Sequence, residues 1–373
     1  MREEWKYKKL GEVCTIKAGY TPQKNELSDN GAYPYYKVAD MNTLGNDVYL
    51  DITSSYKIDA NKLFPKGAIV FPKNGAAVST NKKRILKYDS IVDLNTGVAI
   101  FPKSINEKFA YYWFIDTDFK KYVRGGALPT LDIKSLKDKP FPSIDKSIQL
   151  AIVSELDKIN ELIRLKKEQL KDFDNLAQSL FYEMFGEGKC LRKKLKDIVK
   201  IQSGQVSPLE EPYSEMIHIG PANIESNTGR LLNLKTAKEE NLISGKYLFD
   251  SSMVLYSKIR PNLNKVTIPS FEGICSADMY PIIPLESIDK NFLLFLLKQK
   301  EFLTYAISNS GRANIPKINR EALLNYEAIL PPLPLQHLFA HRIEQIEHQK
   351  AEVQKAITDL ETLLASRMQY WFE

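Results

Sequence analysis

The sequence contains little cysteine and no long apolar segment, and both absences limit the class of protein. The three cysteines, Cys14, Cys190 and Cys275, lie too far apart for any pair to have metal-ligand spacing. An odd number of widely separated cysteines is typical of a reducing compartment. No uncharged apolar run approaches the roughly 20 residues of a membrane-spanning helix, and the N-terminus has no apolar signal core. We therefore expect a soluble, cytoplasmic protein without a membrane segment.

The common sequence motifs of catalytic and cofactor sites are also missing. The chain has no GxxxxGK[ST] phosphate loop, no GxGxxG dinucleotide fingerprint and no GxSxG nucleophile elbow. It also lacks the NPPY or DPPY tetrapeptide of adenine methyltransferases and the PD-(D/E)xK pattern of nucleases. We therefore expect no catalytic residue and no cofactor-binding residue in this chain.

Three histidines near the C-terminal end resemble a metal site only in their spacing. His337, His341 and His348 are four and seven residues apart, which brings them near one face of a helix, where zinc could bind. The matching positions of the internal repeat described below hold no histidine. A polar helix face that meets solvent or a partner subunit is the simpler interpretation, and we expect no metal ligand here.

The composition supports more than one folded domain. A length of 373 residues corresponds to two to four units of roughly 100–200 residues, and 43% of the residues are hydrophobic. The 52 basic and 46 acidic residues leave a net charge of +6. Such a small excess indicates a polyanionic partner only where the basic residues are clustered.

The chain contains two copies of one pattern. Residues 9–19 (KLGEVCTIKAG) match residues 194–204 (KLKDIVKIQSG). At the same offset, the strand-like segment 63–73 (LFPKGAIVFPK) matches 248–258 (LFDSSMVLYSK). Two further pairs follow at nearly this offset: the amphipathic helical patterns at 105–114 and 288–297, and residues 128–136 with 315–323. Because the order of the matches is kept along the chain, we infer an internal duplication.

Each copy ends in a predicted helix of roughly 40 residues, which corresponds to a rod about 60 Å long. One follows Pro142 and ends at Phe185, the other follows Pro334 and ends at Phe372, and proline suits a helix start rather than its interior. Apolar residues recur every seven positions in both helices and in one shared register, as in helices that pack along their length. The predicted coiled-coil and partner-docking residues are Ile152, Leu156, Ile159, Ile163, Leu170, Phe173 and Leu180, followed by Ile343, Ile346, Val353, Ile357, Leu360 and Leu364. Three basic residues interrupt the repeat: Lys166, Lys350 and Arg367.

This order predicts an α/β (α+β) fold with two β-rich arms separated by two long helices. The second arm joins the end of the first helix to the start of the second, so helices that pack together must run antiparallel. The arms would then lie at opposite ends of a rod about 60 Å long, related by an approximate twofold axis. The predicted domains are the first arm at 1–143, the first helix at 144–186, the second arm at 187–331 and the second helix at 332–373.

Basic and amide side chains cluster in the loops after equivalent strands. Lys73 and Lys258 hold equivalent places, so we infer one role for this loop in both arms. Lysine and arginine neutralise phosphates, while arginine pairs with guanine and asparagine with adenine; a solvated loop is the alternative for any single residue. Two unlike arms suit duplex DNA, whose major groove returns to one face about every 34 Å. The candidate DNA-binding residues are Lys73, Asn74, Lys82, Lys83 and Arg84 in the first arm, and Lys258, Arg260, Asn262, Asn264, Lys265, Arg312 and Asn314 in the second. A weaker candidate surface is formed by residues 35–37 and 217–219.

Several of these segments resemble a known family. KLGEV at 9–13, VLYSKIRPNLNKV at 254–266, CSADMYPI at 275–282 and LPPLPLQ at 330–336 are similar to the specificity (S) subunit of type I restriction–modification systems. The resemblance covers the whole chain, although the first arm has PKNGAAVSTNKK where the second has SKIRPNLNK.

The resemblance implies a function for each part of the chain. Each arm would be a target-recognition domain that reads one half of a split, asymmetric site in double-stranded DNA. The helices would set the gap between the halves and dock two methyltransferase (M) subunits. S-adenosylmethionine, ATP and Mg²⁺ would then belong to partner subunits and none to this chain, and restriction (R) subunits would be further partners.

Two other classes of protein remain as alternatives. A self-sufficient enzyme that modifies nucleic acid would need a cluster of carboxylates or a nucleophile that the sequence does not reveal. A coiled-coil scaffold without a DNA role would leave the paired basic loops unexplained.

Overall fold

The computed structural model divides the chain into two compact units. Unit 1 consists of Met1–Glu168 and Gln354–Glu373, and unit 2 consists of Gln169–Val353. The structure describes residues 5–53, 55–57, 62–125, 129–186, 190–311 and 314–372.

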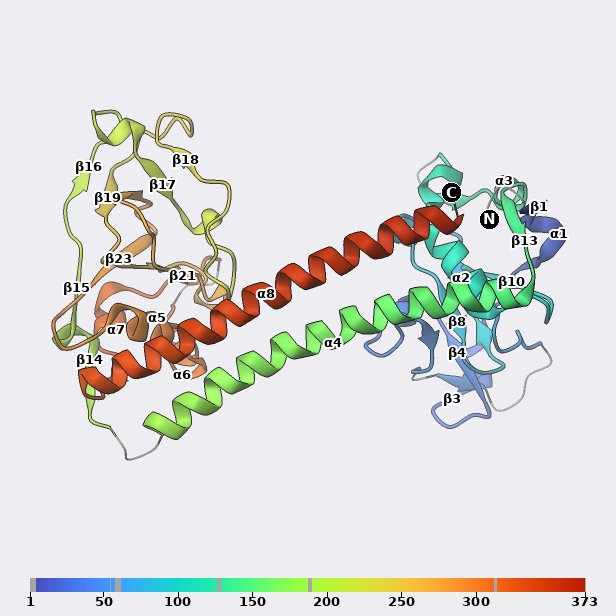
Figure 1. Ribbon diagram of the computed structural model, residues 1–373, viewed down its shortest axis with the longest axis horizontal. Coiled ribbons are helices and arrows are strands. Elements are labelled where there is room, and N and C mark those ends of the chain that lie inside the picture. The colour runs from blue at the N-terminus through green and yellow to red at the C-terminus, as the bar shows by residue number, and fades with distance from the viewer. Residues whose placement is uncertain are drawn as a thin grey trace. The chain divides into compact units, whose positions relative to one another are not determined.

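The two long helices lie where the sequence predicted them. They are α4 (Lys146–Phe185) and α8 (Leu333–Phe372), and each contributes one half to unit 1 and the other half to unit 2 (Figure 1). No helix of the described residues is long and apolar enough to cross a membrane.

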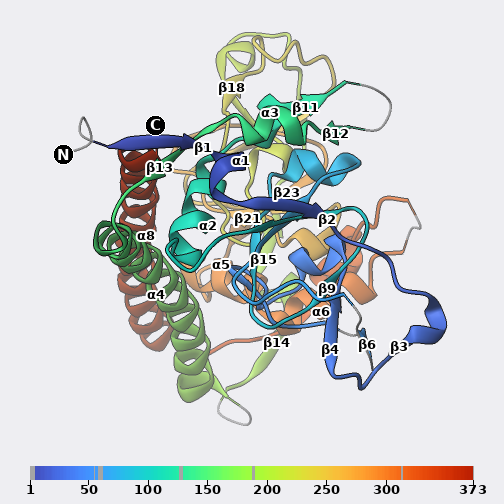
Figure 2. The same ribbon diagram turned by 90° about the vertical axis from the view of Figure 1, so that its right-hand side faces the viewer.

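Unit 1 is built around a twisted sheet with strand order β2-β10-β7-β8-β5, and a smaller sheet has the order β3-β6-β4-β9. A two-stranded ribbon of β1 and β13 leads into α4 (Figure 2), with Lys6 opposite Ser143. The elements of the first arm are β1 (Lys6–Lys9), α1 (Leu10–Val13), β2 (Thr15–Ala18), η2 (Lys24–Glu26), β3 (Leu27–Ser28), β4 (Tyr33–Tyr36), η3 (Val38–Asn42), β5 (Tyr49–Leu50), β6 (Tyr56–Lys57), β7 (Ile69–Pro72), η4 (Ala76–Thr80), β8 (Arg84–Leu86), β9 (Ile91–Val92), β10 (Thr96–Ile100), α2 (Glu107–Asp116), η5 (Phe119–Tyr122), β11 (Val123–Arg124), β12 (Thr130–Leu131), α3 (Ile133–Lys137) and β13 (Pro140–Ser143).

Unit 2 repeats this arrangement. Its sheet β15-β23-β20-β21 has the connectivity of β2-β10-β7-β8, and the ribbon of β14 and β24 matches that of β1 and β13. The parallel pair β17 and β22 matches the parallel pair β4 and β9. The elements are β14 (Arg192–Lys194), η6 (Leu195–Asp197), β15 (Val199–Ile201), β16 (Gln205–Val206), η7 (Tyr213–Glu215), β17 (Ile217–Ile219), η8 (Pro221–Asn223), β18 (Lys235–Thr236), β19 (Lys246–Phe249), β20 (Val254–Ser257), η9 (Pro261–Leu263), β21 (Val266–Thr267), β22 (Gly273–Cys275), β23 (Met279–Pro284), α5 (Lys290–Lys298), α6 (Lys300–Ser308), α7 (Arg320–Leu324) and β24 (Glu327–Ile329). The internal duplication and the mixed α/β fold are therefore confirmed.

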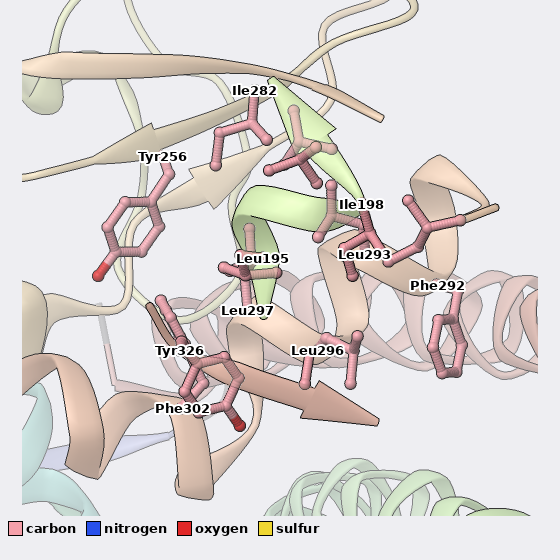
Figure 3. Close-up of a cluster of buried hydrophobic side chains, with 14 of the residues drawn as sticks. Leu195, Ile198, Tyr256, Ile282, Phe292, Leu293, Leu296, Leu297, Phe302 and Tyr326 are labelled. Atoms are coloured by element: carbon pink, nitrogen blue, oxygen red, sulfur yellow. The ribbon is translucent and has the colours of Figure 1, made fainter. Parts of the chain in front are cut away.

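The core of unit 2 lies between its main sheet and the helices of the second arm. Apolar residues of α5 pack against Tyr256 of β20 and Ile282 of β23 (Figure 3). The side chain of Asp289 starts α5 by accepting hydrogen bonds from the backbone N–H groups of Asn291 and Phe292. In unit 1, Asn106 does the same for α2. Each arm therefore presents one firmly capped helix to its sheet.

The long helices run antiparallel in both units. In unit 1, Glu155 is paired with Arg367, and Lys167 Nζ lies 2.8 Å from Glu361 Oε1. In unit 2, Lys350 Nζ lies 2.8 Å from Asp174 Oδ1, and the ring of Phe185 packs against that of Phe339. Residue numbers rise along one helix as they fall along the other, as the sequence predicted.

The seam is the line along which α4 and α8 face each other, and the residues predicted to form it are buried or half-buried. Ile152, Leu156, Ile159, Ile163, Ile346, Val353 and Ile357 are buried, and Leu170, Phe173, Leu180, Ile343, Leu360 and Leu364 are half-buried. Two basic residues that interrupt the repeat, Lys350 and Arg367, reach carboxylates on the opposite helix. The seam therefore tolerates a cation where a facing anion neutralises it.

Candidate nucleic-acid interface

The second loop, residues 258–265, links β20 to β21 and holds an unusual backbone. Arg260 has φ 48° and ψ 60°, and Asn264 has φ 48° and ψ 54°. Both residues are therefore in the left-handed region, which costs an L-residue roughly 1–2 kcal/mol and which asparagine tolerates better than arginine. Pro261–Leu263 form the short 3-10 helix η9 between them. A strained arginine that the surrounding structure holds in place is a candidate functional residue.

The first loop, residues 73–84, has the same plan in unit 1. Gly75 has φ +75°, Ala76–Thr80 form the 3-10 helix η4, and Asn81 has φ 55°. Gly75 thus stands in the place of Arg260, and Asn81 in the place of Asn264. Both positions have positive φ, which glycine adopts without a steric cost, but the ψ angles differ, at −174° for Gly75 and 60° for Arg260.

The same three backbone contacts hold each loop against a neighbouring segment. In unit 2, Ile318 N–H donates to Lys258 O at 3.0 Å, Arg260 N–H donates to Pro316 O at 2.7 Å, and Ile259 forms a β-bridge with Lys317. The corresponding contacts in unit 1 are Leu131 N–H to Lys73 O at 2.9 Å, Gly75 N–H to Pro129 O at 2.7 Å, and a bridge between Asn74 and Thr130. A shared scaffold therefore presents residues that differ between the arms.

The contacts in unit 2 gather several cations around the second loop. Lys258 Nζ lies 5.4 Å from the centre of the Tyr280 ring. Partial burial lowers the pKa of Lys258, and the neighbouring cations Lys317 and Arg320 act in the same direction while Asp278 opposes them. Like charges held this close favour an anionic ligand that would neutralise them.

The predicted DNA-binding residues of the second arm differ in their exposure to solvent. Arg260, Asn262 and Asn314 are exposed, and Lys258 is half-buried at the edge of the cationic group. Lys265 is also half-buried, and its Nζ donates to Pro221 O at 2.7 Å. Arg312 lies outside the described residues.

The prediction for Asn264 does not hold. This side chain is only 8% exposed, and its Nδ2 donates to Lys298 O at 3.3 Å. Its left-handed backbone ends η9. Asn264 therefore shapes the loop from within the protein and does not present its amide to a base.

The first arm requires two further corrections. Lys83 is completely buried: its Nζ donates to Thr117 O at 2.7 Å and lies 4.1 Å from the centre of the Phe119 ring. Burial lowers the pKa of this ammonium to about 7. The guanidinium of Arg84 donates to the backbone oxygens of Asn46, Lys83 and Met41. Both cations therefore donate hydrogen bonds to backbone oxygens of the arm itself. Lys73, Asn74 and Lys82 are half-buried at the loop surface.

The weaker candidate surface, residues 35–37 and 217–219, is mostly buried, although Lys37 is exposed and Ile217 is half-buried. Tyr35 and Tyr36 are 2% and 1% exposed, and His218 and Ile219 are 7% and 0% exposed. These residues belong to the parallel strand pairs β4–β9 and β17–β22. Their apolar pattern was a sign of a core strand.

The sequence did not reveal some other candidate functional residues. Arg320 joins the cations of the second loop only through the fold, because it lies far from Arg260 along the chain. The segments around Pro129 and Pro316 were matched as repeats, but their role as supports for the loops was not visible. His337, His341 and His348 are exposed on α8. The described residues contain no group of three His, Cys, Asp or Glu side chains that could hold a metal ion.

Solved structures with this fold include two chains from type I restriction–modification (R-M) systems. A chain solved in work on the complex assembly and conformational transition of the type I R-M system superimposes with a TM-score of 0.63 at 17% identity, covering 99% of this chain and 97% of its own length. The S subunit from M. genitalium gives a TM-score of 0.57 at 16% identity, with 99% and 96% covered.

Sequence relatives give the family. The type I restriction enzyme EcoDI specificity subunit of Escherichia coli is 27% identical over 95% of this chain and 84% of the relative. The MjaIX specificity subunit of Methanocaldococcus jannaschii is 22% identical over 97% of this chain and 91% of the relative. The model of the type I restriction modification DNA specificity domain matches residues 2–172 and again residues 191–362. Because these two matches cover most of the chain, the chain belongs to the family of type I restriction modification DNA specificity domains.

Proposed function

We propose that this chain is the DNA-reading subunit of a type I restriction–modification complex and that each arm reads one half of a split DNA site. The pair of loops on a shared backbone scaffold carries the proposal. Lys73, Asn74 and Gly75 occupy the places that Lys258, Ile259 and Arg260 occupy in the second arm. A common support with variable side chains is what two readers of unlike sequences require, because base contacts specify and backbone contacts position.

The second arm has the better-defined reading surface. Arg260 is exposed two residues after Lys258, whose charge interacts with those of Lys317 and Arg320, and Asn262 follows two residues later. Arginine can donate two hydrogen bonds to guanine, and asparagine can pair with adenine. The neighbouring lysines suit phosphates, which would place the arm on the duplex.

The helices supply the other half of the proposal. The α4–α8 seam sets the gap between the half-sites, and its outer faces dock two methyltransferase subunits, with restriction subunits as further partners. The chain itself is not an enzyme in this proposal. S-adenosylmethionine, ATP and Mg²⁺ belong to those partner subunits, because no residue group that we describe is suited to methyl transfer or cleavage.

A DNA selection with the assembled complex tests the proposal. The chain, purified with its methyltransferase subunits, should enrich a site of two unlike half-sites separated by a fixed gap of unspecified bases. Replacing Lys258 and Arg260 by alanine should relax only one half-site, with each lost base contact costing about 1–3 kcal/mol. The exposed Lys196 provides a matched control, since Lys196→Ala removes a charge of the same arm outside residues 258–265.

The selection also separates the rival functions. A scaffold without a DNA role would enrich no sequence. A self-sufficient enzyme would methylate or cut DNA when the purified chain alone receives S-adenosylmethionine or Mg²⁺, and such activity would refute the proposal.

A further inference from the structure

Both long helices carry a buried glutamine at the same position of their first turn. Gln149 of α4 is 1% exposed, and Gln336 of α8 is completely buried. A buried primary amide must find partners for its oxygen and for both N–H groups. In each unit it finds three, all of them backbone groups.

The three partners are equivalent in the two units. Gln149 Oε1 accepts from Asn106 N–H at 2.8 Å, while its Nε2 donates to Ser104 O at 3.3 Å and to Ile144 O at 2.9 Å. Gln336 Oε1 accepts from Asp289 N–H at 2.8 Å, while its Nε2 donates to Ser287 O at 3.0 Å and to Pro331 O at 2.7 Å. Asn106 and Asp289 are the N-caps of α2 and α5.

This pattern joins each long helix to its arm by directional hydrogen bonds. The chain enters α4 through Ile144, directly after β13, and apolar residues of α4 such as Ile152 and Leu156 also pack in the core of the arm. Apolar contacts are non-directional, so they hold the helix on the arm without fixing its angle. The bonds to Ser104 and Asn106 run to the start of α2, which is packed on the main sheet of the arm. The three directional bonds therefore define an angle that apolar packing alone would define less sharply.

We propose that Gln149 and Gln336 are positioning residues that set the angle between each long helix and its arm, and through it the gap at which the two half-sites are read. The inference rests on the proposed function. The seam of α4 and α8 controls distance along the helices, whereas these glutamines control the direction in which each arm meets the DNA. One residue type repeated with the same three partners in both copies supports a common role.

Gap discrimination in the assembled complex tests the inference. Duplexes would carry the two half-sites selected by the wild-type complex, with gaps varied in single-base-pair steps. The measured quantity is the ratio of affinity at the preferred gap to affinity one base pair away. In Gln149→Met and Gln336→Met, which keep the shape and remove the hydrogen bonds, this ratio should fall by about tenfold or the preferred gap should change. The preference for each half-site sequence should stay unchanged.

Matched controls come from exposed glutamines of the same two helices. Gln178→Met in α4 and Gln349→Met in α8 should keep the wild-type ratio. If Gln149→Met does not fold, Gln149→Asn serves, because it keeps a neutral amide whose shorter side chain cannot reach all three backbone partners.

The outcomes are distinct. A lower melting temperature with an unchanged gap ratio would mean that the glutamines only stabilise the helix starts, and this would overturn the inference. A wild-type complex without a preferred gap would overturn the proposed function itself. This outcome is detected with the wild-type complex alone, before any variant is measured.

Discussion

Replacing Arg260 should change stability and DNA binding in a way that separates backbone strain from side-chain contact. Both Arg260→Gly and Arg260→Ala remove the guanidinium, so each should weaken DNA binding by about 1–3 kcal/mol if it contacts a base. Only glycine relieves the backbone at φ 48°, where an L-residue pays roughly 1–2 kcal/mol. Glycine also gives the unfolded chain more backbone freedom, which lowers the free energy of unfolding by about 0.5–1 kcal/mol and offsets part of this gain. Arg260→Gly should therefore be more stable than Arg260→Ala by about 1 kcal/mol.

Thermal unfolding and DNA titration of the assembled complex measure the two effects. A difference of about 1 kcal/mol corresponds to about 2–4 °C in the melting temperature of a unit of this size. Gly75→Ala is the matched control with the opposite sign: φ is +75° and an added Cβ would meet no atom within 4 Å, so its cost is backbone strain alone. Equal melting temperatures for the two Arg260 variants would refute the strain reasoning. Unchanged DNA affinity in both would remove Arg260 from the interface.

Three further changes test other parts of the structure. Lys83→Met should leave DNA binding unchanged, because this ammonium is buried. The cost of burying the charged ammonium is fully present below its folded-state pKa of about 7 and disappears as pH rises towards the ordinary lysine pKa of 10.5. The stability of the variant relative to wild type should therefore fall as pH rises through that range. Weaker DNA binding by Lys83→Met would contradict the buried role. Glu155→Gln should destabilise the seam by about 1 kcal/mol or less, since both partners are partly solvated; because Arg367 lowers the pKa of Glu155, the difference should vanish as pH falls through that lowered pKa. A difference that persists unchanged at low pH would exclude the ion pair as its cause. Removing residues 164–170 and 351–357 should shorten the selected gap by about three base pairs, because one heptad of helix spans about 10 Å; an unaltered gap would count against helices that set the distance.

The large-scale plan was predictable because it depends on periodicity and connectivity. Apolar residues every seven positions identify helices that pack along their length, and a duplication with one arm between two helices requires them to be antiparallel. The seam residues around Leu156 and Val353 are buried as the pattern indicates. Even the interruptions were informative, because Lys350 and Arg367 mark positions where the opposite helix supplies a carboxylate.

The individual roles of charged loop residues were less predictable because local sequence does not reveal burial. Lys82 and Lys83 are neighbours of identical type, yet Lys82 reaches the loop surface and Lys83 is completely buried against Phe119. Asn264 was interpreted as a base reader because of its amide, but its backbone at φ 48° explains its presence. Only tertiary contacts distinguish these cases.

A signal for the buried glutamines was present in the sequence and was missed. Gln149 and Gln336 are separated by the same offset that aligns the apolar residues of the two long helices. The comparison of the two helices considered only apolar residues, so a polar residue repeated in the same register was not recognised as significant. A duplication supplies its own comparison, and a buried amide kept in both copies is as informative as a kept leucine.

The two junctions differ beyond their glutamines, and the difference predicts which arm is held more loosely. In unit 1, Asp157 of α4 accepts hydrogen bonds from Lys108 Nζ and from Tyr112 Oη of α2, both at 2.6 Å. In unit 2, the place of Tyr112 is taken by Phe295, whose ring lies 4.7 Å from that of Phe339. Ring packing is less directional than charge-assisted hydrogen bonds. Loss of Gln336 should therefore relax gap discrimination more than loss of Gln149, because unit 1 keeps a second polar attachment between its arm and α4.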